Sequence, residues 1–470
     1  MALASGSCCW AVVVAAAAVA ARAGGAAGTL AAAAASPVRA GAALATARAR
    51  EAPVSHRPPR YRVDLDLPAR ERWGGVLSDA LGRLGTRPFL EYYNAVLAGL
   101  QEQYPKDLAF YRAHLAEFQR AYADLLPDAL EEVYALADAL RARAETDEER
   151  QRFSRGEVFL VQLHMQMGNI GVPAHGECTS VVVRRPSGAV AHFRNWDFGP
   201  LPDALGLASV EVDFVFGSTG RQGFRCLLAL THMDKWTTCM KPGTFSMSLN
   251  ARTFGRGHER GRAPSEELAL LQEGRRPRVA VLREVMLAES YEAALTAASS
   301  THALSSMYVI LAGPAQVGAV AQGGRGAVVT LSGNGSSADV LPLPGPEEGW
   351  FLVQTNVDHW LPMSDERPSS HRREHVKALL QGLGEGAPLE SLYKVLQDQG
   401  VFPPGHEGPD DGRVFRPSTV ASVLMLPEAH AAAGAQAENA SWATDVWRPR
   451  VRTSWGGAAA PNAKAVWLWM

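Results

Sequence analysis

The sequence predicts an α+β protein in which a mainly helical N-terminal segment precedes stacked layers of sheet and helix. Between residues 73 and 155 the apolar residues recur at the spacing of amphipathic helices. After Cys178 most of the chain consists of short β-branched and aromatic runs between Gly- and Pro-containing turns, which is typical of strands. Several helical stretches interrupt these runs, and elements of both kinds bury their apolar faces by stacking in layers.

The N-terminal part begins with a predicted strand and continues as helices. Residues 61–67 alternate apolar and polar side chains, as a short, half-buried strand would. About four or five helices are expected between 73 and 155. The clearest starts at Pro127 and has its apolar residues on one face, namely Leu130, Val133, Leu136 and Leu140. Residues 156–163 fit either a strand or a buried helix.

The part after Cys178 contains most of the predicted strands. They are 179–184, 189–194, 209–216, 223–231, 245–250, 307–313, 318–321, 327–331, 350–355 and 418–426. Helices are predicted at 265–271, 279–299, 370–383 and 389–399. The Gly- and Pro-rich stretches at 341–349 and 402–417 are predicted to be surface loops.

The composition is that of an ordinary globular protein. The 470 residues suffice for two or three domains. The chain is 47% hydrophobic and 20% charged, with a formal net charge of -2, and it has no concentrated basic stripe, so we expect no nucleic-acid partner. Beyond residue 50 no apolar run is long enough to cross a bilayer.

Residues 1–50 are predicted to be a targeting segment rather than part of the fold. They are rich in alanine, contain four arginines and lack Asp and Glu. Residues 8–21 resemble a signal peptide, but no positive charge precedes them, and the segment also fits an organelle transit peptide. Glycosylation triplets at Asn334 and Asn439 favour a secretory route. We therefore expect a lysosome or another acidic or secretory compartment, with a plastid or other organelle as the alternative.

Cysteine usage leaves one thiol for chemistry. Removal of the targeting segment removes Cys8 and Cys9 and leaves Cys178, Cys226 and Cys239. An odd, low count argues against a disulfide framework. Cys226 and Cys239 are accordingly expected to be buried apolar residues.

Residues 178–197 are predicted to form a β-hairpin with reactive groups at its open end. Two β-rich runs flank the turn residues 185–188. In an antiparallel pair the end of the second strand lies beside the start of the first, so Arg194 and Asp197 should lie next to Cys178. A neighbouring arginine favours the reactive thiolate. The alternative is a structural cysteine on a strand beside a surface ion pair.

Several motifs in the chain resemble the acid ceramidase and N-acylethanolamine acid amidase family, which belongs to the cholylglycine-hydrolase-like N-terminal-nucleophile hydrolases. The resemblance covers roughly residues 60–430. It rests on the stretch 61–73, Cys178-Thr-Ser with Arg194-Asn-Trp-Asp197-Phe, Lys241-Pro-Gly with Asn250-Ala-Arg252, Tyr308-Val-Ile-Leu-Ala-Gly313, and Gln354-Thr-Asn356-Val-Asp-His-Trp360 with Asp365-Glu-Arg367.

The resemblance implies an αββα sandwich and a precursor that cuts itself between Glu177 and Cys178. The products would be a mainly helical α subunit, residues 51–177, and a catalytic β subunit, residues 178–470. Acid ceramidases join their subunits by a disulfide, but this chain has no cysteine between 51 and 177. Its two fragments would therefore be held together without a covalent bond.

The same resemblance assigns roles to the site residues. Cys178 would be the nucleophile, and its freed α-amine would be the base. Asn356 would donate to the oxyanion, Arg194 and Arg367 would polarise the site, and Asp197 would hold the α-amine. No cofactor and no metal is implied.

One departure from the family concerns its Asn-Glu-Arg triplet, whose acidic residue is counted among the active-site residues. This chain has Ala251 at that position. By the resemblance, proton handling or substrate choice is the property that this departure calls into question. Asn250 is the candidate to compensate, by binding substrate. A lipid-binding relative that has lost turnover is the alternative that this departure motivates.

A second candidate site is the pattern His371-Arg-Arg-Glu374-His375. It matches H-x-x-E-H, in which two histidines on one helix face bind zinc. Two imidazoles need a third ligand, and the arginines would surround the metal with positive charge. A charged surface face is the favoured interpretation, and a zinc peptidase is the remote one.

The sequence therefore predicts a self-processed cysteine amidohydrolase that acts on N-acylated lipids. Ceramide, cleaved to a fatty acid and a sphingoid base, is the first substrate, on the residues around Asn250. An N-acylethanolamine is the second, on the residues after Asn356. Such substrates imply transient contact with a membrane or micelle surface or with a lipid-presenting protein.

Overall fold

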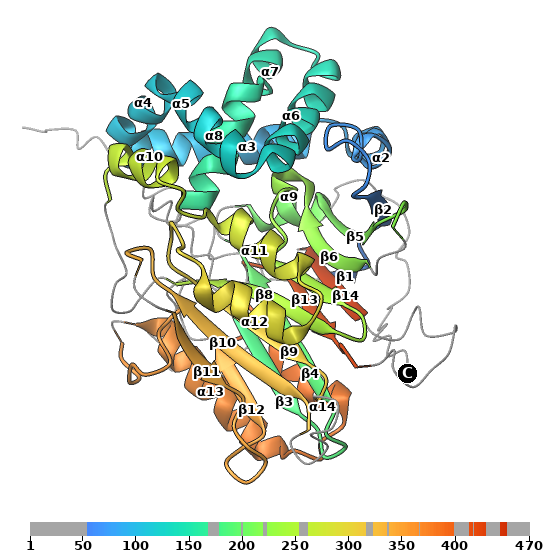
Figure 1. Cartoon of the computed structure of the whole chain (residues 1–470). Coiled ribbons are helices and arrows are strands. Elements are labelled where there is room, and N and C mark those ends of the chain that lie inside the picture. The colour runs from blue at the N-terminus through green and yellow to red at the C-terminus, as the bar shows by residue number, and fades with distance from the viewer. Residues whose placement is uncertain are drawn as a thin grey trace, which may run out of the picture. The chain divides into compact units, whose positions relative to one another are not determined.

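Two stacked β-sheets form the centre of the protein, as the computed structural model shows (Figure 1). The structure describes residues 54–167, 178–198, 201–219, 223–252, 262–315, 323–335, 338–365, 367–398, 413–416, 418–428 and 442–448. Of residues 54–56, 165–167, 368 and 442–448 only the backbone is described. The predicted cleavage bond, the strand expected at 318–321 and the triplet at Asn439 lie wholly or partly outside these ranges.

The first sheet contains the predicted hairpin. Its strand order is β1-β14-β13-β4-β3-β12. The bounds are Val54–His56, Trp442–Arg448, Thr419–Met425, Val190–Asp197, Thr179–Arg184 and Phe351–Gln354. All neighbouring strands in it are antiparallel. The hairpin β3–β4 therefore lies inside the sheet, between β13 and β12.

The second sheet faces the first and has the order β11-β10-β9-β8-β7-β6-β5-β2. The bounds are Asp339–Pro342, Arg325–Leu331, Met307–Gly313, Phe245–Ala251, Thr238–Lys241, Phe224–Ala229, Ser209–Val215 and Arg60–Asp64. Only the pair β2–β5 is parallel among the described strands. Strand β2 joins the sheet from the N-terminal segment, far away in sequence.

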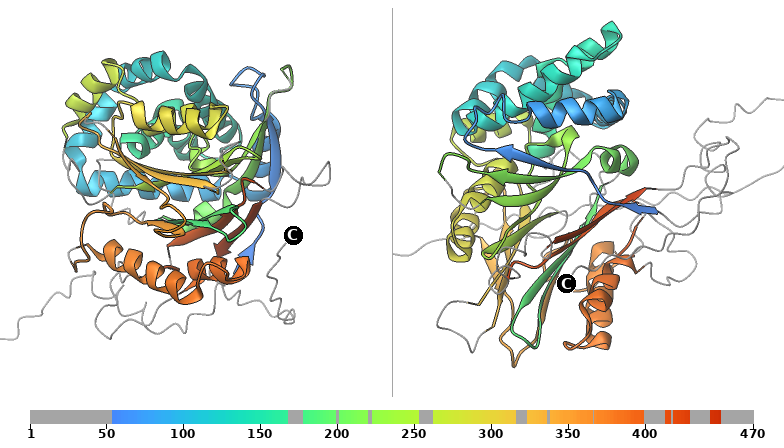
Figure 2. Two further views of the ribbon diagram at one scale, coloured as in Figure 1. Left: turned by 60° about the horizontal axis from the view of Figure 1, so that its bottom comes forward. Right: turned by 90° about the vertical axis from the view of Figure 1, so that its right-hand side faces the viewer.

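Helices cover the outer faces of both sheets. The N-terminal helices are α2 to α8, with bounds Gly74–Leu84, Arg87–Gln103, Pro105–Ala113, Leu115–Leu125, Pro127–Ala142, Asp147–Arg152 and Arg155–Met167. The later ones are α9 to α14, with bounds Pro202–Leu207, Pro264–Gln272, Arg278–Leu287, Tyr291–Ser300, Pro368–Leu383 and Leu389–Lys394. Helices α13 and α14 lie on one side of the sandwich, and α11 and α12 lie on the other (Figure 2).

Three apolar clusters hold these four layers together. Between the sheets, Val182 packs with Ile310 and its neighbours. Outside the first sheet, Val183 and Phe193 pack with α13 and α14. Outside the second sheet, the N-terminal helices and α10 to α12 share one larger cluster. The alternation along β3 sends successive valines to opposite faces. The predicted αββα sandwich with an N-terminal helical segment is thereby confirmed.

Most predicted elements are present, with differences at their boundaries. Residues 156–163 lie in helix α8, and six helices rather than four or five lie between 73 and 155. Helix α3 ends before Pro105 because a proline disfavours the helical conformation of the residue that precedes it, here Tyr104. The stretch 279–299 forms two helices, separated at 288–290. Strands β1, β7, β11 and β14 were not predicted, and β11 extends into the stretch 341–349 that was expected to be a surface loop.

The two cysteines expected to be free form a disulfide. Cys226 on β6 and Cys239 on β7 are register partners in neighbouring strands, and a bond joins their sulfurs. The expectation that they are merely buried apolar residues is wrong. The count argument failed because Cys178 belongs to the site and leaves an even pair behind. Cys178 is the free cysteine in the described part of the chain.

This disulfide predicts a measurable loss of stability in the double variant Cys226→Ala/Cys239→Ala. The bond closes a loop with a sequence separation of 13 residues. A loop of similar length restricts the unfolded chain by about 3 kcal/mol, so we expect the free energy of unfolding to fall by about 2–4 kcal/mol. Denaturant unfolding with and without reductant measures it. Reductant should destabilise the wild type and leave the variant unchanged; equal sensitivity of the two would contradict the bond.

A buried histidine predicts acid sensitivity of the helical layer. Burial, and then the charges of Lys235 and Arg278, lower the pKa of His164 to about 3. His164 is thus neutral in the fold, whereas in the unfolded chain it binds a proton near pH 6.5. The stability that neutral His164 contributes to the fold is therefore fully present above about pH 6.5, and it is lost as the pH falls toward 3.

His164→Leu should accordingly reduce the acid-induced loss of stability. Between about pH 7 and about pH 4.5 the free energy of unfolding should fall by roughly 2 kcal/mol less in the variant than in the wild type. Chemical denaturation at the two pH values measures the difference. His302→Gln, at an exposed position, is the control and should behave as the wild type. Parallel curves for wild type and His164→Leu would refute the assignment.

Candidate active site

The β3–β4 hairpin brings a thiol and a guanidinium into contact. Cys178 directly precedes β3, and Ser180 pairs with Arg194 across the hairpin. The Nη2 atom of Arg194 lies 3.4 Å from the Cys178 sulfur. The sulfur also lies 4.0 Å from the backbone oxygen of Asp197. The predicted meeting of thiol and guanidinium at one end of the hairpin is therefore present, whereas Asp197 contributes its backbone oxygen and not the predicted carboxylate.

Arg194 is buried and held in place by oxygens of the second sheet. Its Nη1 atom donates to the backbone oxygen of Thr237 at 2.9 Å and to the Thr238 hydroxyl. Its Nη2 atom donates to the backbone oxygen of Leu249 at 2.5 Å. These oxygens are neutral, so they fix the guanidinium without cancelling its charge. A cation held this way against a thiol stabilises the thiolate.

Asn356 holds the backbone nitrogen of the same cysteine. It follows β12, the strand next to β3, and is fully buried. Its Oδ1 atom accepts from the Cys178 nitrogen at 2.9 Å and from Nη2 of Arg372 at 2.8 Å. Its Nδ2 atom donates to the backbone oxygen of Ala251 at 2.8 Å. Asn356 is thus at the nucleophile, and its role as oxyanion donor stays a prediction.

Asp197 contributes its backbone to the thiol and its side chain to the neighbouring strand. The Oδ1 atom accepts from the Thr419 hydroxyl of β13 at 2.6 Å. The predicted contact of the carboxylate with the α-amine requires the amine that cleavage releases, and it stays a prediction. Glu177, the other side of the predicted cleavage bond, lies outside the described residues.

Asn250 lies between the two sheets. Its Nδ2 atom donates to the backbone oxygen of Gln354 at 2.8 Å, and its Oδ1 atom accepts from the Ser180 hydroxyl at 2.9 Å. Both partners belong to the first sheet, so Asn250 ties β8 to β3 and β12. These bonds are structural, and the predicted binding of substrate by Asn250 stays a prediction.

Arg367 stands apart from the other predicted site residues. It directly precedes α13, and its backbone nitrogen donates to the Ser364 oxygen at 2.9 Å. In the described part of the chain no hydrogen bond joins its side chain to Cys178 or Asn356. The arginine that reaches the site from this region is Arg372, one turn into α13.

The H-x-x-E-H pattern is partly buried, which the sequence did not predict. Arg372 and Arg373 are 0% and 3% exposed, so the expectation of a charged surface face is wrong for both. His371 bonds to Asp365 at 2.9 Å and His375 to Asp398 at 2.6 Å. Among the described residues no three His, Cys, Asp or Glu side chains are grouped as metal ligands. The two imidazoles thus serve separate carboxylates, which gives the zinc hypothesis no support.

Known proteins can be aligned with most of this chain. A family model for the beta subunit of N-acylethanolamine-hydrolyzing acid amidase matches residues 56–107. The N-acylethanolamine-hydrolyzing acid amidase of Cavia porcellus is 29% identical over 72% of this chain and 82% of its own length. The acid ceramidase of Heterocephalus glaber is 25% identical over 73% and 80%. Over most of its length the chain is thus similar to members of the acid ceramidase and N-acylethanolamine acid amidase family.

Two further matches come from Caenorhabditis elegans. The Caenorhabditis elegans N-acylethanolamine-hydrolyzing acid amidase is 26% identical over 77% of this chain and 93% of its own length. A solved structure of the Caenorhabditis elegans ortholog of that enzyme has 29% identity and a TM-score of 0.41, and it covers 53% of this chain.

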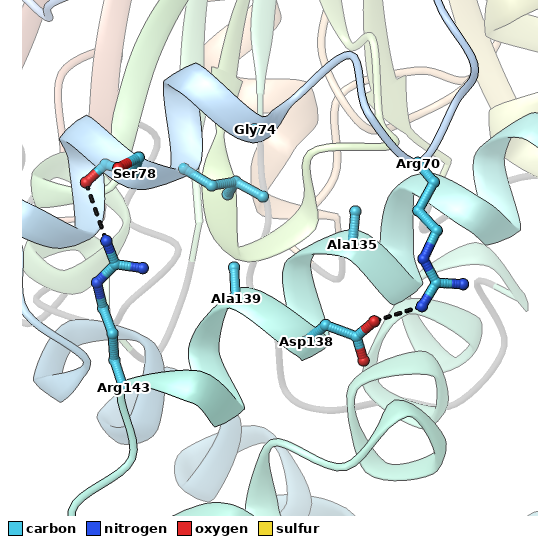
Figure 3. A pocket seen from close by; sticks show the side chains of 8 residues that line it. Arg70, Gly74, Ser78, Ala135, Asp138, Ala139 and Arg143 are labelled. Atoms are coloured by element: carbon cyan, nitrogen blue, oxygen red, sulfur yellow. Dashed lines mark hydrogen bonds and ion pairs between the residues drawn. The ribbon is translucent and has the colours of Figure 1, made fainter.

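The helical segment contains a pocket, which Figure 3 shows from close by. It has a volume of about 220 Å³ and lies between α2 and α6, with Arg70, Ser78, Asp138 and Arg143 among its lining residues. An ion pair joins Arg70 to Asp138, and Arg143 donates to the Ser78 backbone oxygen at 3.3 Å. None of the hairpin residues lines it, so it is not the place where Cys178 meets a substrate.

Arg372 is the site residue that the motifs missed. The signal was present, because on a helix Arg372 lies one turn from Ser369 and Val376, both of which are buried. An arginine on the buried face of a helix needs a partner, and here the partner is Asn356. The Arg372 guanidinium and the nitrogen of the predicted nucleophile therefore share one acceptor atom, Oδ1 of Asn356.

Arg372→Gln should lower kcat/KM of this amidase-type centre by roughly 10- to 100-fold, because hydrogen bonds to charged groups contribute about 1.5–3 kcal/mol. Arg373→Gln is the matched control. Arg373 is the next residue of the same helix, is also buried, and donates to the backbone oxygens of Asp358 and Leu361 instead. Amide hydrolysis per folded molecule is the measurement. Equal activity of the two variants would remove Arg372 from the site.

Proposed function

We propose that this protein is a self-processed cysteine amidohydrolase that cleaves the amide bond of N-acylated lipids. One observation carries the proposal. The Cys178 sulfur lies 3.4 Å from a buried guanidinium, while the nitrogen of the same residue is held at 2.9 Å by the Asn356 amide. The thiol and the nitrogen of one residue are thus both held in place, the thiol beside the Arg194 cation, as a nucleophile that supplies its own base requires.

Cleavage between Glu177 and Cys178 would complete this centre. In the intact chain the Cys178 nitrogen is an amide and cannot accept a proton. Cleavage releases an α-amine with an ordinary pKa of about 7.7–8.0. The amine takes the thiol proton, and the thiolate attacks the carbonyl carbon of the substrate amide. The amine then gives its proton to the leaving nitrogen, a thioester remains on Cys178, and water hydrolyses it to the free fatty acid.

The charge of Arg372 supports activity at acidic pH. Its guanidinium binds the same Asn356 oxygen as the Cys178 nitrogen. A nearby cation disfavours protonation of an amine and lowers its pKa. The α-amine would therefore remain an effective base below its usual range. This supports a lysosome or another acidic compartment as the site of action, with residues 1–50 as the targeting segment.

The family relatives favour an N-acylethanolamine as the substrate, ahead of ceramide. Over similar shares of this chain, the Cavia porcellus N-acylethanolamine-hydrolyzing acid amidase is 29% identical (72% of the chain) and the Heterocephalus glaber acid ceramidase is 25% identical (73%), while the Pan troglodytes acid ceramidase reaches 29% over only 48%. We therefore place the N-acylethanolamine first and ceramide second, which reverses the order that the motif around Asn250 suggested.

No described helix combines the length and apolarity needed to span a bilayer. The lipid would be taken from a membrane or micelle surface or from a lipid-presenting protein.

Self-processing and turnover can be tested together on purified full-length protein held at acidic pH. Intact mass and N-terminal sequencing should show two fragments, the larger starting at Cys178. Cys178→Ala should stay whole and release no fatty acid. The double variant at Cys226 and Cys239 is the control for loss of sulfur and should still be cut.

A substrate panel then separates the candidate functions. Fatty-acid release from N-palmitoylethanolamine faster than from N-palmitoylsphingosine supports the first substrate, and the reverse order supports ceramide. Binding of either lipid without release at any pH would support the lipid-binding alternative that Ala251 motivates. A chain that stays whole and inactive would refute the mechanism.

A further inference from the structure

A buried loop between β6 and β7 contacts the helical segment on one side and the active-site hairpin on the other. It runs from Leu230 to Thr237 and includes a short 3-10 turn, Leu230–His232. Most of its side chains are buried, among them those of Thr231, Asp234 and Trp236. A loop that is both buried and polar needs partners for its backbone and its charges. Those partners come from sequence segments far apart.

Three side chains of the helical segment bind this loop directly. The Thr231 backbone oxygen accepts from the Tyr93 hydroxyl at 3.1 Å and from Nε2 of Gln162 at 2.6 Å. The Asp234 carboxylate accepts from the Tyr122 hydroxyl at 3.1 Å. Burial raises the pKa of both tyrosines well above the ordinary value, so their hydroxyls remain donors. The donors lie on α3, α8 and α5, all before the predicted cleavage bond.

The other end of the loop holds the cation of the active site. Thr237 accepts from Nη1 of Arg194 at 2.9 Å through its backbone oxygen, and the next residue, Thr238, accepts through its hydroxyl. Nη2 of the same guanidinium lies 3.4 Å from the Cys178 sulfur. Only two residues, Lys235 and Trp236, separate Asp234 from Thr237. A shift of the loop at Asp234 would therefore move the oxygen that positions Arg194.

Further contacts make the loop a rigid connection. The Arg283 guanidinium of α11 lies 4.5 Å from the centre of the Trp236 ring. Arg283 also forms a buried ion pair with Glu132 of α6. The His232 ring lies 5.9 Å from that of Phe198, which follows the hairpin. The loop is thus held at both ends and in its middle, so displacement at one end is transmitted to the other.

We propose that the helical segment positions Arg194 against Cys178 through the β6–β7 loop, with Tyr93, Tyr122 and Gln162 as positioning residues. This rests on the proposed function, in which Arg194 stabilises the Cys178 thiolate. Charge stabilisation in a buried site depends steeply on distance, and small misplacements reduce rates strongly. After cleavage the helical fragment has no peptide bond to the hairpin, and these hydrogen bonds are one route from the fragment to the nucleophile, beside the contact of the Tyr92 ring with Phe198.

The test compares two loop variants with a matched control in the full chain. Tyr122→Phe removes the donor to Asp234, and the double variant Tyr93→Phe/Gln162→Leu removes both donors to Thr231. Tyr111→Phe is the control, because the Tyr111 hydroxyl is also buried and crosses the same interface, but it binds Glu267 of α10 instead of the loop. Thermal unfolding establishes that all three variants fold and how much stability each loses.

Two readouts report on Arg194 itself. The first is the rate at which iodoacetamide alkylates Cys178, measured by peptide mass spectrometry, which follows the thiolate population and needs no substrate. The second is the separation of kcat from KM in amide hydrolysis. In both loop variants Cys178 should be alkylated roughly 5- to 10-fold more slowly, and kcat should fall by a similar factor. KM should be unchanged, because the weakened interaction acts in the transition state. Tyr111→Phe should match the wild type in both.

The outcomes separate this proposal from the proposed function. If the loop variants match the wild type in alkylation and kcat, or if Tyr111→Phe loses as much as they do at equal stability, the loop does not position Arg194. Wild-type protein whose Cys178 is alkylated no faster than that of Arg194→Gln would instead refute the role of Arg194 and with it the proposed function.

Discussion

The antiparallel pairing of β3 with β4 is the constraint on which the site depends. It sets Ser180 opposite Arg194 and so brings a guanidinium to the residue that precedes β3. A buried cation is costly unless other groups compensate for the lost hydration. Here oxygens of β8 and of the β6–β7 region bind it. The second sheet is therefore needed to keep a charge beside the thiol of the first.

A line of hydrogen bonds keeps the two sheets in register near this charge. His192 bonds to the Ser246 and Ser248 hydroxyls at 3.0 and 2.9 Å. Ser248 bonds to Ser180 at 2.9 Å, and Ser180 donates to Asn250 at the same distance. Burial lowers the pKa of His192 to about 3, so this histidine stays neutral under mildly acidic conditions. Polar groups replace part of an apolar interface here, and they fix one alignment of the sheets because a shifted register would leave them unpaired.

The sequence was informative where chemistry follows from local order, and less so where it follows from packing. The hairpin could be predicted because two β-rich runs flank one turn, and this placed Arg194 correctly, whereas Asp197 presents its backbone oxygen instead of the predicted carboxylate. For Arg372 only the helix face could be recognised from the sequence; its partner could not, because Asn356 is brought to it by the packing of α13 on the first sheet. The disulfide was missed for a related reason. Cys239 lies on a four-residue strand whose pairing with β6 no periodicity reveals.

The same packing explains how a cleaved chain would stay assembled without a disulfide between its fragments. Strand β2 of the N-terminal part pairs with β5 inside the second sheet, and β1 pairs with β14 at the edge of the first. Glu132 is fully buried between Arg72 of its own fragment and Arg283 of the other. Separation would expose the shared apolar cluster and leave Arg283 without its carboxylate, which is strongly unfavourable for a buried pair. Covalent continuity at the cleavage bond is therefore not what holds the helical layer on the sheets.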